Sequence, residues 1–322
     1  MRILLINPNT SRAMTAKIAD AARGVAGPDV LVDAVCPAVG AAAIESHVDE
    51  VAAAAAVVEL ITADRDGLAP ADAYVIACFG DPGLDAAREL VDAPVVGIAE
   101  AAMHLAAVSG RHFGVVTTLS RTLGRARDLV GRYGMERACV SLAATGIPVL
   151  DLEDTGSDAV ATIERFAADA ASGGADVIVL GCAGMADLCA ELTARVGVPV
   201  VDGVAAAVGL ASGMVRMGLG TSKRDEYAAP PVRPGAARGG AGVGAGVPSG
   251  FGADSALWGG EITPQSANHA PNAATAAANA AATTAANAAN AAANAAANAA
   301  ANAAAAPSPR PADTSSTARV FA

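Results

Sequence analysis

The chain has 322 residues and a formal net charge of −11, so it has no basic surface suited to nucleic acid. It has no uninterrupted apolar run of about 18 residues that could span a membrane, and we expect a cytoplasmic protein whose five cysteines are free thiols. Residues 1–227 hold nearly all the large aliphatic side chains, whereas residues 228–322 are dominated by Ala, Gly, Asn and Pro. This composition predicts two folded domains followed by a disordered, low-complexity tail.

Short apolar segments alternate with alanine-rich segments of helix length along residues 1–227. This alternation is typical of an α/β fold in which mainly parallel sheets are flanked by helices. The predicted strands are residues 3–6, 30–35, 74–77, 95–98, 114–116, 177–180 and 199–201, and the predicted helices lie near residues 11–24, 47–63, 84–91, 121–133, 158–172 and 186–195.

An internal repeat relates two parts of the chain. A shift of 104 residues places Cys182 on Cys78 and Gly184 on Gly80, together with the apolar strands that precede them. The segment around Thr117 is a weaker echo of the segment around Asn7. Two similar half-chains predict two similar α/β domains related by a pseudo-twofold axis. We assign residues 1–95 plus 208–227 to the first domain, 96–207 to the second and 228–322 to the tail.

The repeat places Cys78 and Cys182 at the ends of two predicted strands. In open parallel sheets, ligands bind at the carboxyl ends of strands, so two facing domains would bring both thiols to one cleft. A helix start after each cysteine would favour the thiolate and lower its pKa. Two such thiols could remove a proton from one face of a carbon atom and return one to the other face, as a coupled pair.

The charge of the resulting enolate would need hydrogen-bond donors close to it. The loops Asn7–Ser11 and Thr117–Ser120 each join a strand to a helix start, and they are the expected source of these donors. Asn7 and Thr117 would then face the ligand from opposite domains.

Other polar residues have simpler interpretations. Asp81 before Pro82 can cap a helix or belong to the site, and Glu45 can face either the cleft or solvent. Ser46 with Asp49 resembles a capping box. We expect Cys36, Cys139 and Cys189 to fill apolar space. The four histidines show no spacing that suggests a metal site, so no metal or other cofactor is expected.

Several motifs together resemble the aspartate/glutamate/hydantoin racemase family, and in particular its hydantoin and allantoin racemase branch. The motifs are Ile6-Asn7-Pro8-Asn9-Thr10-Ser11, Ile76-Ala77-Cys78-Phe79-Gly80-Asp81-Pro82-Gly83-Leu84, Val179-Leu180-Gly181-Cys182-Ala183-Gly184-Met185 and Pro199-Val200-Val201-Asp202-Gly203-Val204.

The resemblance covers roughly residues 1–227 and implies two domains with a site between them, a cofactor-free mechanism and a homo-oligomer. It implies that Cys78 and Cys182 are the acid/base pair. The implied substrate contacts are Asn7, Thr117, Thr118, Gly181 and Gly184. Phe79, Gly80 and Ala183, which follow the two cysteines, are further candidate contacts.

The substrate expected from these features is a 5-substituted hydantoin or allantoin. The aspartate and glutamate branches of the family usually have an acidic residue at the first strand end, where this chain has the neutral Asn7. No cation is expected to clamp two carboxylates, because Arg12 and Arg121 are predicted to face solvent. Aspartate or glutamate racemisation stays an alternative. So do maleate isomerisation, malonate decarboxylation (although that needs only one cysteine) and non-catalytic binding of a small molecule in a two-lobed cleft.

Overall fold

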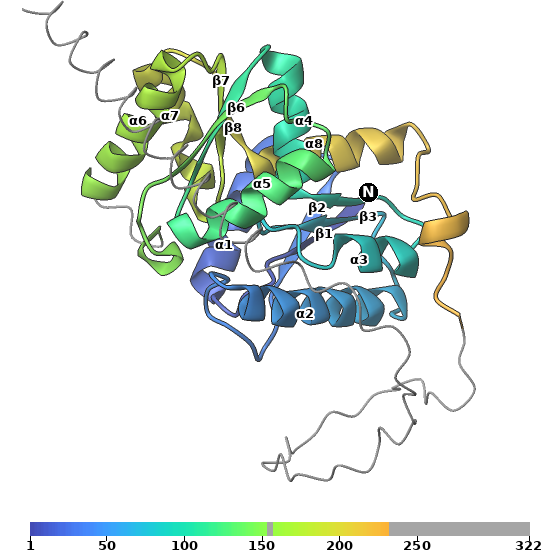
Figure 1. Ribbon diagram of the computed structural model, residues 1–322. Coiled ribbons are helices and arrows are strands. Elements are labelled where there is room, and N and C mark those ends of the chain that lie inside the picture. The colour runs from blue at the N-terminus through green and yellow to red at the C-terminus, as the bar shows by residue number, and fades with distance from the viewer. Residues whose placement is uncertain (153–156, 232–322) are drawn as a thin grey trace, which may run out of the picture. The chain divides into compact units, whose positions relative to one another are not determined.

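The computed structural model describes residues 1–152 and 157–231. These residues form an α/β fold whose strands and helices mostly alternate along the chain, as the sequence predicted (Figure 1). The strands are β1 (Arg2–Ile6), β2 (Leu31–Val35), β3 (Ala73–Ile76), β4 (Val95–Gly97), β5 (Phe113–Thr117), β6 (Cys139–Ala144), β7 (Val177–Leu180) and β8 (Val200–Asp202). The helices are α1 (Arg12–Val25), α2 (His47–Arg65), α3 (Leu84–Leu90), α4 (Ile98–Ser109), α5 (Leu123–Arg132), α6 (Ser157–Ser172), α7 (Cys189–Val196) and α8 (Gly203–Arg216).

The strands form two four-stranded sheets with the same internal order. The first sheet runs β2-β1-β3-β4 and the second runs β6-β5-β7-β8, and every strand pair is parallel. In the first sheet Ile6 lies opposite Ile76, and in the second Val116 lies opposite Leu180. The loops after β1 and β3 therefore leave the first sheet side by side at its carboxyl edge, and the loops after β5 and β7 do the same in the second sheet. The prediction of two similar parallel sheets flanked by helices is confirmed.

Each sheet is covered by helices on both faces because its central strands are apolar on both sides. Side chains of α1 and α8 pack on one face of the first sheet, and those of α2 and α3 pack on the other. On the second sheet, α4 and α5 cover one face, and α6 and α7 cover the other. Helix α8 follows the last strand of the second sheet but returns to pack against β3 and β1 of the first.

Helices α4 and α8 pack against each other where the two sheets meet (Figure 1). Small residues allow this close approach. A Cβ atom at Gly203 would lie 2.7 Å from the backbone oxygen of Ile98, which is closer than a side-chain carbon can come. Most buried residues of α4 and α8 are alanines, which have the strongest helix propensity and add little bulk between the sheets.

The sequence prediction missed three elements. Strand β6 has the sequence Cys-Val-Ser-Leu-Ala-Ala, lies at the edge of its sheet and has no fully buried residue, so it shows no apolar run. Helices α4 and α8 begin directly where β4 and β8 end, so no loop marks where strand becomes helix. The expected tail, residues 228–322, lies outside the described residues from residue 232 onward.

Candidate active site

Cys78 and Cys182 lie at equivalent places in the two sheets. Cys78 comes two residues after β3, and Cys182 comes two residues after β7. Each begins a similar turn, because the Cys78 carbonyl accepts the backbone N–H of Asp81 at 2.9 Å and the Cys182 carbonyl accepts that of Met185 at 3.1 Å. Both cysteines are partly exposed, and both line one cavity of about 200 Å³. The structure therefore brings together the two cysteines that the repeat singled out.

Both thiols are hard to ionise, which differs from the sequence prediction. Burial raises the pKa of Cys78 to about 12, and a hydrogen bond from the Gly80 backbone N–H opposes this rise. Burial likewise raises the pKa of Cys182 to about 11, opposed by the backbone N–H of Gly184. The expected lowering by a helix dipole is wrong because neither cysteine directly precedes an α-helix. Helix α3 begins only at Leu84, and the segment after Cys182 is a 3-10 turn over Ala183–Leu188.

The two thiols differ in the charges around them. Burial has the largest effect on the pKa of Cys78. A negative charge on Cys182 raises this pKa further, and so do the charges of Asp81 and Glu50. Near Cys182, the ammonium group of Lys17 partly opposes the effect of burial on the pKa. Lys17 extends from α1 and donates to the Leu152 carbonyl at 2.8 Å. The negative charge of Glu45 raises the pKa of Cys182, so this thiol lies near both a cation and an acidic group.

The loop after β1 contributes two buried asparagines to the cavity. The Asn7 side-chain amide donates to Asn9 Oδ1 at 2.8 Å and to Thr15 Oγ1 at 2.9 Å, so its N–H groups are engaged within the protein. The Asn9 amide nitrogen has only the Met14 sulfur as a partner, at 3.6 Å, among the residues that the structure describes. Asn9, which the sequence interpretation did not single out, is therefore the better hydrogen-bond donor toward a ligand.

The end of β5 and the loop after it contribute two buried threonines, of which one is free to bind a ligand. Thr117 donates its hydroxyl to the Gly181 carbonyl at 2.9 Å. A Cβ atom at Gly181 would lie 2.7 Å from the Thr117 Cβ, so glycine is required for this contact. The Thr118 hydroxyl makes no hydrogen bond with any described residue and lines the cavity.

The other predicted contacts divide into two groups. Phe79, Gly80 and Ala183 line the cavity with the cysteines. Gly184 does not line it. A Cβ atom there would meet Leu152 and Met14, each at 3.2 Å, and the residue instead donates its backbone N–H to the Cys182 sulfur.

Two arginines, Arg121 and Arg125, line the cavity. Arg12 and Arg121 are both exposed, as expected, but Arg121 also lines the cavity. Arg125 is paired with Glu50 at 2.7 Å, so its charge is balanced. Arg121 forms no hydrogen bond or ion pair with any described residue, and its charge lowers the pKa of Asp49 from a distance. Arg121 lies in the 3-10 turn Ser120–Thr122 just before α5, and Arg125 lies on α5 four residues later. This helical spacing was the available signal that the two arginines share a face. The remaining lining residues that the sequence interpretation did not assign to the site are Met14, Ile44, Ser46, His47, Glu50, Ala77, Thr122, Ala126 and Val149.

The structure settles the residues with two interpretations. Glu45 faces the cavity and accepts the Val149 backbone N–H at 2.9 Å. Ser46 caps α2 by accepting the Asp49 backbone N–H, and its hydroxyl donates back to the Asp49 carboxylate at 2.7 Å, so the capping box is confirmed. Asp81 is also a cap, but for α4 and not for α3, as described below.

Neither a membrane span nor a metal cluster is found in the described part of the chain. None of the helices within residues 1–152 and 157–231 is long and apolar enough to cross a bilayer. Within the same residues, no group of three His, Cys, Asp or Glu side chains is placed to hold a metal ion.

A family model described as Asp/Glu/hydantoin racemase matches residues 3–211, so the chain belongs to the Asp/Glu/hydantoin racemase family. The prediction that it is an isomerase of this family is confirmed. A hydantoin racemase of Paenarthrobacter aurescens is 41% identical over 232 residues, which cover 71% of this chain and 98% of that one. A hydantoin racemase of Rhizobium meliloti is 43% identical over 235 residues, covering 72% and 96% of the two chains.

Solved structures point to the same branch of the family. The structure of an allantoin racemase from Klebsiella pneumoniae is 49% identical, with a TM-score of 0.70, and the match covers 72% of this chain and 95% of that chain. An allantoin racemase from Pseudomonas fluorescens is 40% identical, also with a TM-score of 0.70, and the match covers 73% of this chain and 99% of that chain.

Proposed function

We propose that this chain is a cofactor-independent racemase that inverts C5 of 5-monosubstituted hydantoins or of allantoin, with Cys78 and Cys182 as the acid/base pair. One observation carries the proposal: two thiols, at equivalent ends of two equivalent sheets, line the same small cavity. Such a pair matches the symmetry of racemisation, in which a proton leaves one face of a carbon atom and another arrives on the opposite face. The similarity to hydantoin and allantoin racemases supports the choice of substrate.

The proposed reaction has two steps. One cysteine, as thiolate, removes the C5 proton, and the electron pair left on C5 delocalises onto the neighbouring ring carbonyl to give an enolate. The other cysteine, as thiol, then donates a proton to the opposite face of C5. The thiolate has moved from one cysteine to the other, so the opposite enantiomer reacts through the same steps in reverse.

The enolate oxygen requires hydrogen-bond donors. The Asn9 amide and the Thr118 hydroxyl are the suitable side chains, because both line the cavity and have groups not satisfied by strong protein hydrogen bonds. Asn7 then acts by orienting Asn9. Burial raises the pKa of both thiols. A high thiol pKa also makes the thiolate a stronger base toward a weakly acidic C–H bond.

A second candidate is racemisation of a free amino acid such as aspartate or glutamate. Arg121 favours it, because a cation that makes no ion pair among the described residues lines the cavity and could bind a carboxylate. The hydantoin is still preferred, because a carboxylate beside the reacting carbon makes its proton far less acidic than a neutral ring carbonyl does. The neutral Asn9 and Thr118 also match a neutral ring better than a second carboxylate.

The proposal is tested by polarimetry on both enantiomers of 5-benzylhydantoin, allantoin and glutamate, with C5 or Cα exchange measured in deuterium oxide. We expect racemisation and exchange with at least one ring compound. Exchange with glutamate alone would favour the second candidate, and tight binding without exchange of any compound would favour a binding protein. Light scattering tests whether the chain is a homo-oligomer, which we propose from the family resemblance.

A further inference from the structure

Arg125 connects α5, which covers the second sheet, to two residues beside the first. Its Nη2 and Nε donate to the Gly80 carbonyl at 2.8 and 3.2 Å, and its Nε lies 2.7 Å from Glu50 Oε1. Gly80 lies in the loop that follows Cys78, and Glu50 lies on α2. One guanidinium therefore binds a backbone carbonyl beside a proposed acid/base group and is itself held by a carboxylate.

Gly80 is also the residue that donates its backbone N–H to the Cys78 sulfur. A hydrogen bond from this N–H stabilises the thiolate more than the thiol, so its direction affects how readily Cys78 ionises. Glycine has no Cβ to restrict its backbone, and a loop glycine can rotate its N–H away unless something else holds it. The contact between Arg125 and the Gly80 carbonyl supplies such a restraint.

The loop after Cys182 does not need an external restraint of this kind. Gly184, the counterpart of Gly80, lies within a 3-10 turn and is covered by Leu152 and Met14. The loop after Cys78 continues differently. Asp81 has a left-handed backbone with φ of 45°, and a helix begins only at Leu84. The two halves of the chain are therefore similar in sequence around the cysteines. They differ in what fixes the backbone N–H that points at the thiol, which is that of Gly80 in one half and that of Gly184 in the other.

The contacts of Arg125 favour a structural role over direct substrate binding. Its planar fork already binds one carbonyl and one carboxylate, and its charge is balanced by Glu50. Arg121, one turn earlier, makes no such contacts with described residues and is the cation available to a ligand.

We propose that Arg125 is a positioning residue for Cys78: by binding the Gly80 carbonyl, it fixes the backbone of Gly80 so that the N–H of the same residue, in the preceding peptide, stays directed at the Cys78 sulfur. This inference rests on the proposed acid/base role of Cys78, but it can be tested without turnover. Loss of Arg125 leaves the Cys78 thiolate without a fixed donor and lowers the fraction of Cys78 that is ionised at a given pH. Cys182, which has its own donor, is unaffected.

The test measures alkylation of each cysteine by iodoacetamide between pH 7 and 9.5, with peptide mass spectrometry to separate Cys78 from Cys182. The variants are Arg125→Gln and Arg125→Lys, since lysine keeps the charge but cannot bind both partners as a planar fork. Arg132→Gln is the matched control. Arg132 also extends from α5 toward the first half of the chain, but it contacts Asp85 and not the Gly80 loop.

We expect Cys78 alkylation to slow about tenfold in both Arg125 variants, which corresponds to a rise of about one unit in the pKa of Cys78. Cys182 in the same samples and both cysteines in Arg132→Gln should react at wild-type rates. Wild-type Cys78 reactivity in both Arg125 variants would overturn the proposal. A wild-type rate in Arg125→Lys alone would also overturn it, because charge rather than positioning would then be the cause. These rates are measured without substrate, so a failure of the proposed racemase activity would be seen separately.

Discussion

The Asp81 carboxylate accepts a hydrogen bond from the Tyr133 hydroxyl, with 2.6 Å between the oxygen atoms. The same carboxylate accepts the backbone N–H groups of Ala99 and Glu100 at 3.0 and 2.9 Å, and so caps α4. A Cβ atom at Gly97 would collide with it at 2.3 Å. Asp81 thus connects the loop after Cys78 to the start of α4 and to the end of α5.

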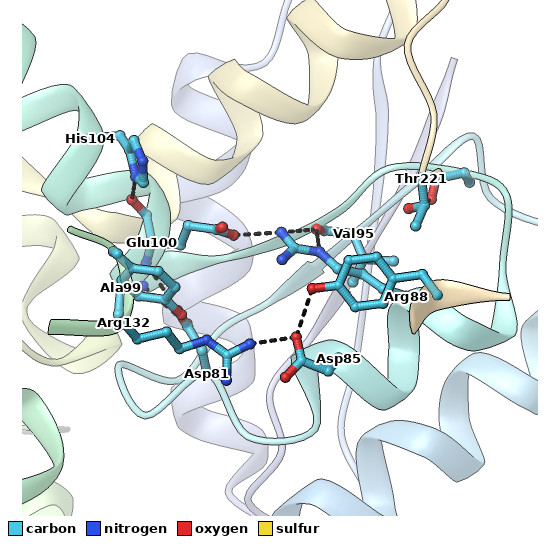
Figure 2. A network of polar contacts seen from close by, with 12 residues as sticks. Asp81, Asp85, Arg88, Val95, Ala99, Glu100, His104, Arg132 and Thr221 are labelled. Carbon is cyan, nitrogen blue, oxygen red and sulfur yellow. Dashed lines mark hydrogen bonds and ion pairs between the residues drawn. The ribbon is translucent and has the colours of Figure 1, made fainter. Parts of the chain in front are cut away.

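Around Asp81 lies a wider polar network. Figure 2 shows Glu100 paired with Arg88 and Arg132 paired with Asp85 in the neighbourhood of Asp81. Arg88 also donates to the Val95 carbonyl, which ties α3 to β4. The contacts of Asp81 itself hold in place the loop that begins at Cys78, whereas the two ion pairs connect α3 to α4 and α3 to α5.

We predict that Tyr133→Phe destabilises the protein by about 1–3 kcal/mol, because it leaves a buried carboxylate oxygen with one donor fewer. Urea unfolding followed by circular dichroism measures the change. Tyr227→Phe is the matched control, since its hydroxyl also donates to an aspartate, Asp85, but at a more exposed place. Equal losses for the two variants would show that burial of Asp81 does not matter.

The stability conferred by Asp81 should depend on pH in a defined direction. Burial raises the pKa of Asp81 from 3.8 to about 6, although hydrogen bonds from Tyr133 and the start of α4 oppose this. Between these two values the folded state binds a proton that the unfolded state has released, so the contribution of Asp81 to the free energy of unfolding falls as pH rises from about 4 to 6. The stability difference between wild type and Asp81→Asn should therefore shrink across this window. A difference that grows would contradict the raised pKa.

The sequence was sufficient to predict the two sheets and the position of Cys78 and Cys182 at equivalent strand ends, because both depend on local signals that occur twice in the repeat. The apolar strands before Cys78 and Cys182 are buried on both faces, and this produces uninterrupted apolar runs. Strand β6 could not be predicted in this way, because Ser141 interrupts its apolar residues and its two alanines favour helix, so this edge strand is specified by its pairing with β5 and not by its own pattern.

The remaining errors concern contacts between residues far apart in the chain. Asp81 before Pro82 has the local pattern of a helix cap, but its partners are 18 and 19 residues away on α4. Arg121 and Arg125 come from a helix on the second sheet and meet the cavity only through the arrangement of the two halves. The thiol pKa values depend on burial, which is a property of the whole fold. No local pattern contains this information.

Replacing either proposed acid/base group should abolish racemisation. Cys78→Ser and Cys182→Ser each remove one thiol, and a serine hydroxyl is a much weaker acid and base near neutral pH, so we expect a loss of about 10²–10⁴-fold. Each variant keeps one thiol and should still exchange the C5 proton of one enantiomer in deuterium oxide. Cys36→Ser is the control, because Cys36 does not line the cavity. Near-normal racemisation by either site variant would rule out the two-base assignment.

Turnover should rise with pH above neutrality. The reaction requires one thiolate, and burial raises the pKa of Cys182 to about 11 and that of Cys78 to about 12. Below these values the thiolate fraction grows about tenfold for each pH unit. We expect kcat/KM for a 5-substituted hydantoin to increase from pH 7 to 9.5, measured by polarimetry on one enantiomer. A plateau already reached at pH 7 would show that ionisation of a thiol does not limit the rate.

Substrate preference should depend on Arg121. Its guanidinium lines the cavity and makes no ion pair with the described residues, so it can bind an anionic group on the C5 substituent. A hydrogen bond between charged groups contributes about 1.5–3 kcal/mol, so Arg121→Gln should lower kcat/KM for 5-(2-carboxyethyl)hydantoin by about 10- to 100-fold. The same variant should change kcat/KM for 5-benzylhydantoin by less than about threefold, since an apolar ring offers no acceptor. Arg127→Gln provides the control, because Arg127 is an exposed arginine of α5 that does not line the cavity. Equal losses on both substrates in Arg121→Gln would indicate a general effect on the site and not recognition of the substituent.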